Sequence, residues 1–514
     1  MSPNQCTRPA VGAAYAASRQ RAEVWRRLRS HAADWASSPD DMGLVLPIQA
    51  DLEELSRIES YQAYPGRRVV ARLSELTVAQ DSSGLSRLVN LVVRMLVSEA
   101  YRVYSADNEE QADLDGDEVY EAYPELILDE RPYFEVLVVD ALPLREQDRL
   151  RERLLSFRSE SDPFVYDVVV VPSFEDALIA VLLNHHIQSV VIRYTFPVES
   201  QHSLGMAERA LARVDRSGLR PETLGVRLGE AVRDLRPNLD LFLVCDADVE
   251  DIAGTHRLFR RIFFRQEDLR ELHQSIVKGV QARYNTPFFS ALKSYSLRPT
   301  GVFHALPIAR GKSISRSHWI REIEDLFGTN LFMAETSATT AGLDSLLQPH
   351  GSLKEAQALA ARAFGAERTW FVTNGTSTAN KIVLQALTSP GDVVLATRDC
   401  HMSHHYAFVL SGVQPLYMDP YPLRRFGFYG GVSLASIKGH LLALRDRGEL
   451  HLARVLLLTN CTFDGIVYNP LRVMQEVLAI QPDMTFIWDE AWFAFAAFTP
   501  TTRRRTAMAA AREL

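Results

Sequence analysis

Short, continuous apolar runs that alternate with helical patterns constrain the fold of this chain more than any other feature. Between residues 133 and 284 the runs are FEVLVVD, YDVVVVPS, QSVVIRY, LDLFLVCDAD and RRIFF, and helical patterns such as FEDALIAVLLN separate them. Runs that are apolar throughout are typical of parallel strands covered by helices on both faces. The sequence therefore predicts an α/β protein with a parallel sheet in this segment.

The order of these five β/α units is similar to that of a receiver domain, which has a flavodoxin-type fold. The first run ends in Asp140, but the third ends in Arg193, where a phosphoacceptor aspartate would be needed. The last run ends in Arg265 and lacks the usual lysine. We therefore predict a receiver-like domain at residues 133–284 that serves as a structural module.

The rest of the chain divides around this segment, as its length of 514 residues requires. Residues 1–132 are rich in arginine and alanine and mostly helical in pattern, with an acidic connector at 108–121. The connector contains DLDGDE but lacks the ligand spacing of a calcium loop. The prolines in NTPFFSALKSYSLRP predict a linker at 285–305, and residues 306–514 have the pattern of a second, larger α/β domain.

Composition excludes several classes of partner. The chain has 56 basic and 64 acidic residues, a net charge of −8 and a pI near 6.0, so nucleic acid and anionic membranes are not expected as main partners. No apolar run approaches the length of a membrane span. The cysteines are far apart and have no zinc spacing, which predicts reduced thiols and a cytoplasmic location: Cys6, Cys245, Cys400 and Cys461.

The stretch TWFVTNGTSTANKIVLQAL, residues 369–387, predicts a strand, a turn and an amphipathic helix. A turn of this kind presents free backbone N–H groups at a helix N-terminus, which favour an anion. The hydroxyls of Ser377 and Thr378 add donors, so the turn is a candidate phosphate site. The alternative is that one of these residues simply caps the helix.

A second candidate follows in VVLATRDCHMSHHYAFVLSG, where His401 stands just after a strand that ends at Thr397. A histidine in this place can stack on a planar ring or donate a proton. His401, His404 and His405 together also suggest a metal site, but the glutamate of an HExxH motif is missing. We therefore predict no metal here.

Two further strands end in polar residues. In RVLLLTNCTFDG a buried strand is followed by Asn460, Thr462 and Asp464. In MTFIWDEAW a buried strand ends in Asp489 and Glu490, and Trp492 stands close behind. A carboxylate at the carboxyl end of a parallel strand lies where open α/β sheets bind ligands. A single acid in such a position is nevertheless common, so the order of all these motifs matters more than each one.

Taken together, the motifs resemble the bacterial Orn/Lys/Arg decarboxylases, which are fold-type-I pyridoxal-phosphate enzymes. The matching stretches extend from about Leu326 to Trp492: DLFGTN, DSLLQPHGSLKEAQALAARAFGAERTWFVTNGTSTANKIV, DCHMSH, TNCTFDGIVYN and WDEAW. The resemblance implies a receiver-like wing domain followed by a PLP-dependent transferase-like large domain.

The resemblance also implies the roles of individual residues around pyridoxal 5'-phosphate. The cofactor phosphate is expected at Thr376, Ser377 and Thr378, and its ring is expected to stack on His401. The ring nitrogen is expected to pair with Asp489. The remaining contacts implied are Trp492 beside the ring, and Thr462 with Asp464 near its phenolic side.

Two departures from the family pattern are present. The family's Pro-Gly-His-x-Gly-Gly segment is replaced by residues 306–311, LPIARG, which follow His304. The Schiff-base lysine is expected after Asp489 in a Ser-x-His-Lys motif, but all six lysines of the chain precede Asp489. The sequence therefore predicts a large domain that is incomplete at its C-terminal side, through truncation, a broken gene or a split protein.

The resemblance implies decarboxylation of arginine, lysine or ornithine to the corresponding amine, in a homodimer or higher homo-oligomer whose active sites lie at dimer interfaces. The alternative is a non-catalytic assembly or regulatory homologue that lacks the lysine. Other fold-type-I chemistries, such as amino-group transfer and aldol cleavage, also stay open. The sequence does not distinguish among the three basic amino acids.

Overall fold

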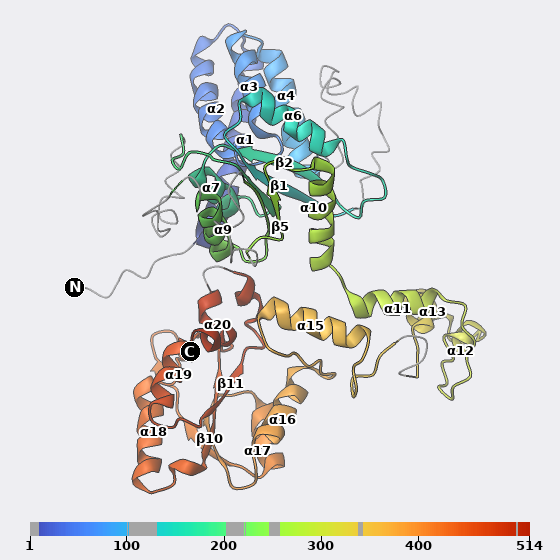
Figure 1. Cartoon of the computed structure of the whole chain (residues 1–514), viewed down its shortest axis with the longest axis vertical. Helices are drawn as coiled ribbons and strands as arrows, with labels where there is room; N and C mark the ends of the chain where they lie inside the picture. The colour runs from blue at the N-terminus through green and yellow to red at the C-terminus, as the bar shows by residue number, and fades with distance from the viewer. Residues whose placement is uncertain are drawn as a thin grey trace. The chain divides into compact units, whose positions relative to one another are not determined.

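Helices and parallel strands build two units in the computed structural model of this chain, Met1–Tyr284 and Asn285–Leu514 (Figure 1). The structure describes residues 10–99, 101, 131–201, 220, 223–245, 258–337, 343–499 and 502–514. The acidic connector with its DLDGDE sequence lies outside these residues.

The first unit begins with helices that confirm the helical pattern of its sequence. These are α1 (Ala10–Ser37), α2 (Val45–Glu59), α3 (Gly66–Val78) and α4 (Ser82–Ser98). Their apolar faces meet in a core of their own, in which Leu28, Trp35 and Leu55 are fully buried. Asp81 starts α4 because its side chain accepts a hydrogen bond from the Gly84 N–H.

A five-stranded parallel sheet forms the rest of the first unit. Its strands have the order β2-β1-β3-β4-β5, which is the flavodoxin-type order. Helices cover both faces, so two apolar cores form, one on each side of the sheet (Figure 1). The strands are β1 (Tyr133–Val139), β2 (Val165–Val171), β3 (Ile187–Arg193), β4 (Asp240–Cys245) and β5 (Arg261–Phe264). The helices between and after them are α6 (Leu144–Leu155), α7 (Phe174–Leu183), α9 (Leu224–Leu235) and α10 (Leu269–Arg283).

An arginine fills the carboxyl edge of this sheet, where a receiver domain carries its phosphoacceptor. The guanidinium of Arg193 lies between the carboxylates of Asp140 and Glu267, at 2.5 and 2.7 Å. All three side chains are largely buried. The carboxylate of Asp140 is thus already paired with a cation that the chain itself supplies.

Buried polar contacts join the segment that follows α2 to α7 and to β1. The Tyr61 hydroxyl donates to Asp176 at 2.8 Å, and the Asn184 amide donates to the Tyr61 carbonyl at 2.8 Å. The Ala63 N–H donates to the buried carboxylate of Glu135 in β1 at 3.0 Å. Because these groups are shielded from water, each depends on its partner for hydrogen bonding.

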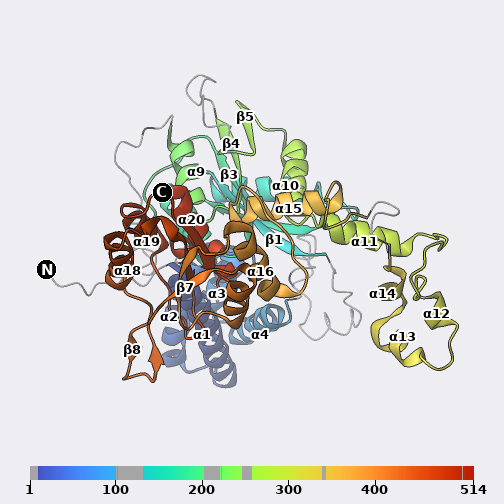
Figure 2. The same ribbon diagram turned by 90° about the horizontal axis from the view of Figure 1, so that it is seen from below.

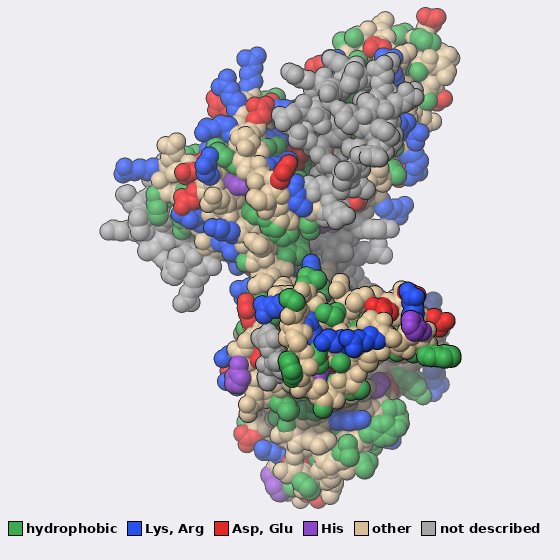
Figure 3. All heavy atoms as spheres, turned by 90° about the vertical axis from the view of Figure 1, so that its right-hand side faces the viewer, with side chains coloured by type: hydrophobic (Ala, Val, Ile, Leu, Met, Phe, Trp, Pro, Cys, Tyr) green, Lys and Arg blue, Asp and Glu red, His purple; other side chains and the backbone are tan. Residues whose placement is uncertain are grey.

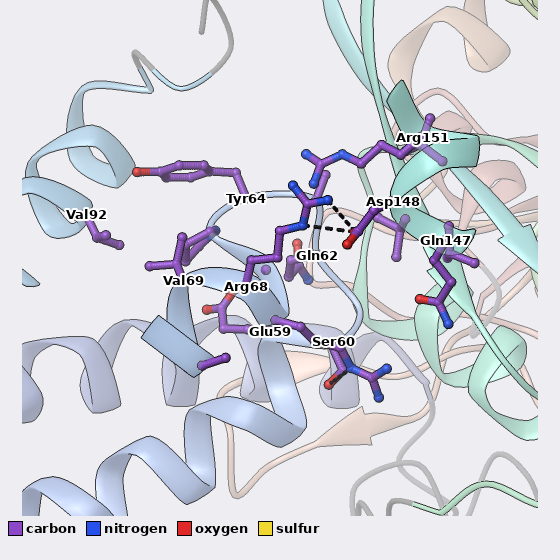
Figure 4. A pocket seen from close by; sticks show the side chains of 18 of the residues that line it. Glu59, Ser60, Gln62, Tyr64, Arg68, Val69, Val92, Gln147, Asp148 and Arg151 are labelled. Carbon is purple, nitrogen blue, oxygen red and sulfur yellow. Dashed lines mark hydrogen bonds and ion pairs between the residues drawn. The ribbon is translucent and has the colours of Figure 1, made fainter. Parts of the chain in front are cut away.

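A cavity of about 440 Å³ lies beside these contacts, lined by parts of α3, α4, α6 and β2 (Figure 4). At its wall Arg68 of α3 donates from Nε to Asp148 of α6 at 2.9 Å. Both side chains are partly exposed, so this ion pair adds little stability. All candidate site residues predicted from the sequence lie in the second unit, and this cavity is therefore no part of that site.

The second unit is built on a four-stranded parallel sheet of order β11-β10-β6-β7. Helices α16 and α17 cover one face and helices α18 and α19 cover the other (Figure 1). The strands are β6 (Val393–Thr397), β7 (Gln414–Met418), β10 (Ala453–Thr459) and β11 (Thr485–Asp489), and a small hairpin of β8 (Pro422–Leu423) and β9 (Phe428–Tyr429) projects from them (Figure 2). The helices are α15 (Ser352–Phe364), α16 (Gly375–Leu387), α17 (Met402–Ser411), α18 (Leu434–Asp446), α19 (Pro470–Leu478) and α20 (Ala507–Glu513).

One predicted strand is wrong. Residues 369–373, which precede α16, form no strand, and Trp370 is 70% exposed. A strand needs a neighbour to complete its backbone hydrogen bonds. Among the described strands none pairs with this segment, because the four-stranded sheet ends at β11 on one side and at β7 on the other.

The predicted linker at 285–305 contains a helix, α11 (Pro287–Leu297), that packs against α14 and α15 of the second unit. It opens an arm that continues through α12 (Lys312–Ser315), α13 (Arg321–Phe327) and α14 (Thr329–Met333) (Figure 2). Arg310 anchors this arm. It is 2% exposed, lies over the ring of Tyr295, and its guanidinium donates to backbone carbonyls of α11, of the loop after it and of Met333.

Candidate active site

The carboxyl edge of the second sheet gathers most of the residues that the sequence singled out. His401 follows β6, the turn with Thr462 and Asp464 follows β10, and Asp489 is the last residue of β11. These strands are parallel and neighbouring, so their carboxyl ends lie at one edge of the sheet. The backbone of Thr459 pairs with that of Asp489 across β10 and β11.

The first turn of α16 has the features of an anion site. Its N-cap, Asn374, has a left-handed backbone (φ 66°) and makes no side-chain capping hydrogen bond. The backbone N–H groups at the start of a helix have no intrahelical partners. Thr376 is exposed and Ser377 and Thr378 are half-buried, so solvent reaches the first turn of the helix. The alternative that Ser377 or Thr378 is the cap is wrong, because the helix begins before them, at Gly375.

Asp489 lies at the centre of a buried hydrogen-bond network and is only 7% exposed. Its Oδ2 accepts from Nε2 of His404 at 2.9 Å and from Nδ2 of Asn380 at 3.2 Å. Its Oδ1 accepts from the Ala491 N–H at 3.2 Å. Asn380 stands one turn after Ser377 in α16, so the candidate phosphate turn and the carboxylate belong to one cluster.

The charge of Asp489 follows from two opposing effects. Burial acts to raise the pKa of its carboxyl group, because a buried charge loses its hydration. The hydrogen bonds from His404, Ala491 and Asn380 act in the other direction and outweigh burial, so the pKa lies below its usual value. Asp489 is therefore an ionised carboxylate at neutral pH.

His401 is exposed and is the N-cap of α17. Its Nδ1 accepts from the Ser403 N–H at 3.2 Å and lies 2.8 Å from the Ser403 hydroxyl. The same hydroxyl accepts from Asn380 at 3.0 Å, and Asn380 also donates to Asp489. Hydrogen bonds thus connect His401 to Asp489 through Ser403 and Asn380.

Trp492 and the turn after β10 come together through a residue that the sequence did not single out. The ring of Phe463 packs edge-on against Trp492, with centroids 5.9 Å apart. In the turn itself Thr462 Oγ1 accepts from the Ile466 N–H at 3.1 Å, while Asp464 is exposed. Trp492 and Phe463 are 66% and 89% exposed, so this pair covers a surface near the sheet edge.

Sequence reasoning missed the buried side chains that connect these residues, Asn380 and Ser403, and noticed His404 only as a candidate metal ligand. The three neighbouring histidines have different partners: His401 bonds to Ser403, His404 to Asp489 and His405 to Tyr417 at 2.7 Å. A polar residue at the apolar face of a predicted helix is the one signal that points to Asn380 and His404.

The lysines take no part in the network around Asp489. Lys381, in α16, lies over the ring of Tyr406 at 5.9 Å, and Lys438, in α18, pairs with Glu476. The other four belong to α10, α11, α12 and α15, on segments that precede the candidate phosphate turn.

Comparison with known proteins identifies this region. The family described as "Orn/Lys/Arg decarboxylase, major domain" matches residues 286–513. Lysine decarboxylase LdcA of Pseudomonas aeruginosa is 30% identical over 288 residues, which make up 53% of this chain and 38% of that protein. Residues 286–513 thus match the Orn/Lys/Arg decarboxylase family. Enzymes of the Orn/Lys/Arg decarboxylase family depend in general on pyridoxal phosphate, as the sequence resemblance implied.

Further relatives within the Orn/Lys/Arg decarboxylases differ in their amino acid. The biodegradative arginine decarboxylase of Escherichia coli is 27% identical over 65% of this chain and 43% of its own length. The constitutive ornithine decarboxylase of Escherichia coli is 34% identical over 42% of this chain and 31% of its own length. The chain thus spans less than half the length of these curated relatives.

Solved structures of lysine decarboxylases are similar as well. The enzyme LdcF of Francisella novicida matches with a TM-score of 0.44 and 20% identity, over 74% of this chain and 49% of that one. Lysine decarboxylase A from Pseudomonas aeruginosa matches with a TM-score of 0.41 and 25% identity, over 73% of this chain and 49% of that one.

Within the residues that the structure describes, no helix has the length and apolar character of a membrane span.

Proposed function

We propose that the second unit binds pyridoxal 5'-phosphate and serves a decarboxylase of basic amino acids. The observation that carries this proposal is the ionised, buried carboxylate of Asp489 in one cluster with an uncapped helix N-terminus. A carboxylate of this kind matches a protonated ring nitrogen, and the helix N-terminus matches a phosphate. Two features that suit the two ends of one cofactor thus lie together.

Each residue would act on a different part of the cofactor. The backbone and hydroxyl donors of Thr376, Ser377 and Thr378 would bind the phosphate. Asp489 would accept a hydrogen bond from the ring nitrogen and hold its proton there. When bound, the cofactor supplies a cationic ring that accepts the electron pair released at Cα as CO₂ leaves.

Residues at the sheet edge would enclose the ring. His401 would cover one face of it, since its ring is exposed and its Nδ1 is held by Ser403. The turn with Thr462 and Asp464 would face the phenolic side, and Trp492 would exclude water beside the ring. These assignments rest on the place of each residue and on the family motifs.

The substrate class follows from the relatives, which decarboxylate lysine, arginine or ornithine by name. We assign a basic amino acid as substrate without choosing among the three. The 514 residues by themselves would hold the cofactor without a covalent bond, because none of the six lysines lies in the network around Asp489.

We further propose a homodimer or higher homo-oligomer. The outer faces of α16 and α17 expose Ile382 (51%), Tyr406 (54%), Val409 (81%) and Leu410 (62%), and hydrophobic side chains are visible on the face of the second unit in Figure 3. Exposed apolar side chains on neighbouring helices are typical of protein interfaces. A cytoplasmic location is inferred from the cysteines, of which Cys245, Cys400 and Cys461 are free thiols.

The test is release of CO₂ from carboxyl-labelled arginine, lysine and ornithine by the product of the whole reading frame that contains these residues. The proposal expects activity on at least one of the three when pyridoxal phosphate is present, and its loss in Asp489→Asn. Asp446→Asn, a change of an exposed acid in α18, is the matched control. Activity that survives Asp489→Asn unchanged would refute the assignment.

A further inference from the structure

A histidine lies directly behind the carboxylate of Asp489. His404 is the third residue of α17 and is completely buried. Its Nε2 is 2.9 Å from Asp489 Oδ2. Because an ionised carboxylate can only accept, Nε2 must carry the hydrogen of this bond. The other ring nitrogen, Nδ1, is buried and has no hydrogen-bond partner among the residues that the structure describes.

A histidine in this place lowers the stability of the fold unless its contact with Asp489 compensates for the unpaired nitrogen. A buried polar atom without a partner lowers stability, whereas an apolar side chain of similar size would fill the same space without that cost. The stabilising contact that His404 makes is the one to Asp489. The side chain therefore acts on the carboxylate and does more than fill space.

The donors to Asp489 are unevenly distributed. Oδ2 receives both side-chain donors, His404 and Asn380, while Oδ1 receives only the Ala491 N–H. Two donors on one oxygen fix the rotation of the carboxylate. Oδ1 is left with accepting capacity for a further donor.

We propose that His404 is a positioning residue, which fixes the rotation of the Asp489 carboxylate so that Oδ1 can accept from the ring nitrogen of the cofactor. This inference rests on the proposed function of the second unit. It assigns to His404 a role that neither the family motifs nor the metal alternative gave it.

In the part of the chain that the structure describes, no other titratable side chain donates a hydrogen bond to Asp489. Cys400 stands just before His401, and burial, together with Asp399, raises the pKa of its thiol to about 12, so it is neutral. Glu490 points away, accepting from Asn460 at 2.6 Å and from the Ala507 N–H at 2.8 Å. The ionisation of Asp489 therefore depends on His404, Asn380 and the backbone.

The experiment compares His404→Gln, His404→Asn and His404→Leu with the unchanged chain. Glutamine places a donor where Nε2 lies, asparagine is too short to reach Asp489, and leucine has no donor. Two quantities are measured: the pKa of Asp489 by ¹³C NMR of the ligand-free chain, and the affinity for pyridoxamine 5'-phosphate at pH 7. His405→Leu, at the next position of the same helix, is the matched control.

We expect His404→Leu and His404→Asn to raise the pKa of Asp489 by about one unit, because the carboxylate loses a hydrogen-bond donor. Binding should weaken about tenfold, because Oδ1 is no longer held in the orientation that faces the ring nitrogen. His404→Gln and His405→Leu should change neither quantity. Circular dichroism shows whether each variant folds. Because the three substitutions differ in reach, the remaining variants can still be compared with the unchanged chain if one of them fails to fold.

The outcomes separate the two proposals. An unchanged pKa of Asp489 in His404→Leu and His404→Asn overturns the role of His404. So does a raised pKa with unchanged affinity, if Asp489→Asn does weaken binding. If the unchanged chain does not bind pyridoxamine 5'-phosphate at all, the proposed function fails, and the assignment of His404 to the cofactor fails with it.

Discussion

Replacing Glu135 by glutamine should stabilise the first unit at high pH and have little effect at low pH. Glu135 lies in β1, is 2% exposed, and its carboxylate accepts from Asn184 at 2.7 Å and from the Ala63 N–H at 3.0 Å. Burial is the largest influence and raises the pKa of Glu135 to about 7; the Asn184 hydrogen bond acts against it and Asp167 adds to it. A glutamine oxygen can accept from the same two donors without carrying charge.

The magnitude follows from the difference between the folded and unfolded pKa values. The folded value of about 7 exceeds the usual value of 4.5, and each pKa unit corresponds to about 1.4 kcal/mol, so the full effect is roughly 3 kcal/mol. The folded state binds the proton more tightly. The stabilisation it provides is therefore complete below pH 4.5, falls as pH rises and is lost above pH 7.

The assay is urea unfolding at pH 5 and pH 8, followed by hydrogen-exchange mass spectrometry of peptides from β1, so that the first unit is measured separately. Glu135→Gln should gain about 3 kcal/mol over the unchanged chain at pH 8 and much less at pH 5. Glu152→Gln, an exposed glutamate in α6, is the control and should change little at either pH. Equal effects of Glu135→Gln at both pH values would refute the reasoning.

Three other predictions concern backbone and ion-pair features. Arg310→Met should destabilise the arm of α11–α14 by about 3 kcal/mol or more, because several buried carbonyls lose their donor; hydrogen exchange in these helices should accelerate, and protection that stays unchanged would contradict the anchoring role. Acetyl phosphate should leave Asp140 unmodified because Arg193 already pairs with it, and an aspartyl-phosphate found there by mass spectrometry would overturn the structural reading of the wing. Gly375→Ala places a side chain at φ +74°, which should lower stability by about 1–2 kcal/mol and weaken binding of pyridoxamine 5'-phosphate. Gly448→Ala, at φ +75° after α18, should lower stability by as much and leave binding unchanged. Equal affinities of the two variants in calorimetry would contradict the phosphate site.

The sequence was sufficient for features that depend on local pattern. Continuous apolar runs predicted both parallel sheets, and a strand that is apolar throughout has few alternatives once helices flank it. The start of α16 at the Gly-Thr-Ser-Thr turn and the end of β11 at Asp489 were also predictable, because polar residues interrupt the apolar pattern there.

Features that depend on long-range contacts could not be predicted. The segment 369–373 has the composition of a strand but has no partner among the described strands, and pairing is not visible in local pattern. The partners of Asp489 come from α16 and α17, which lie 109 and 85 residues before it. Arg310 likewise stands in a segment that departs from the family pattern, and only the fold shows the carbonyls that surround it.

The most direct test of the central claim is calorimetric binding of pyridoxamine 5'-phosphate to the 514-residue chain. The account predicts that Asp489→Asn binds this ligand about 10- to 100-fold more weakly, since a hydrogen bond to a charged group contributes about 1.5–3 kcal/mol. It also predicts that the unchanged chain binds pyridoxamine, which lacks the phosphate, much more weakly than pyridoxamine 5'-phosphate. Asp446→Asn should bind as the unchanged chain does. Equal affinity for the ligands with and without phosphate, or equal affinity of Asp489→Asn and the unchanged chain, would contradict the claim that this unit holds the two ends of one cofactor.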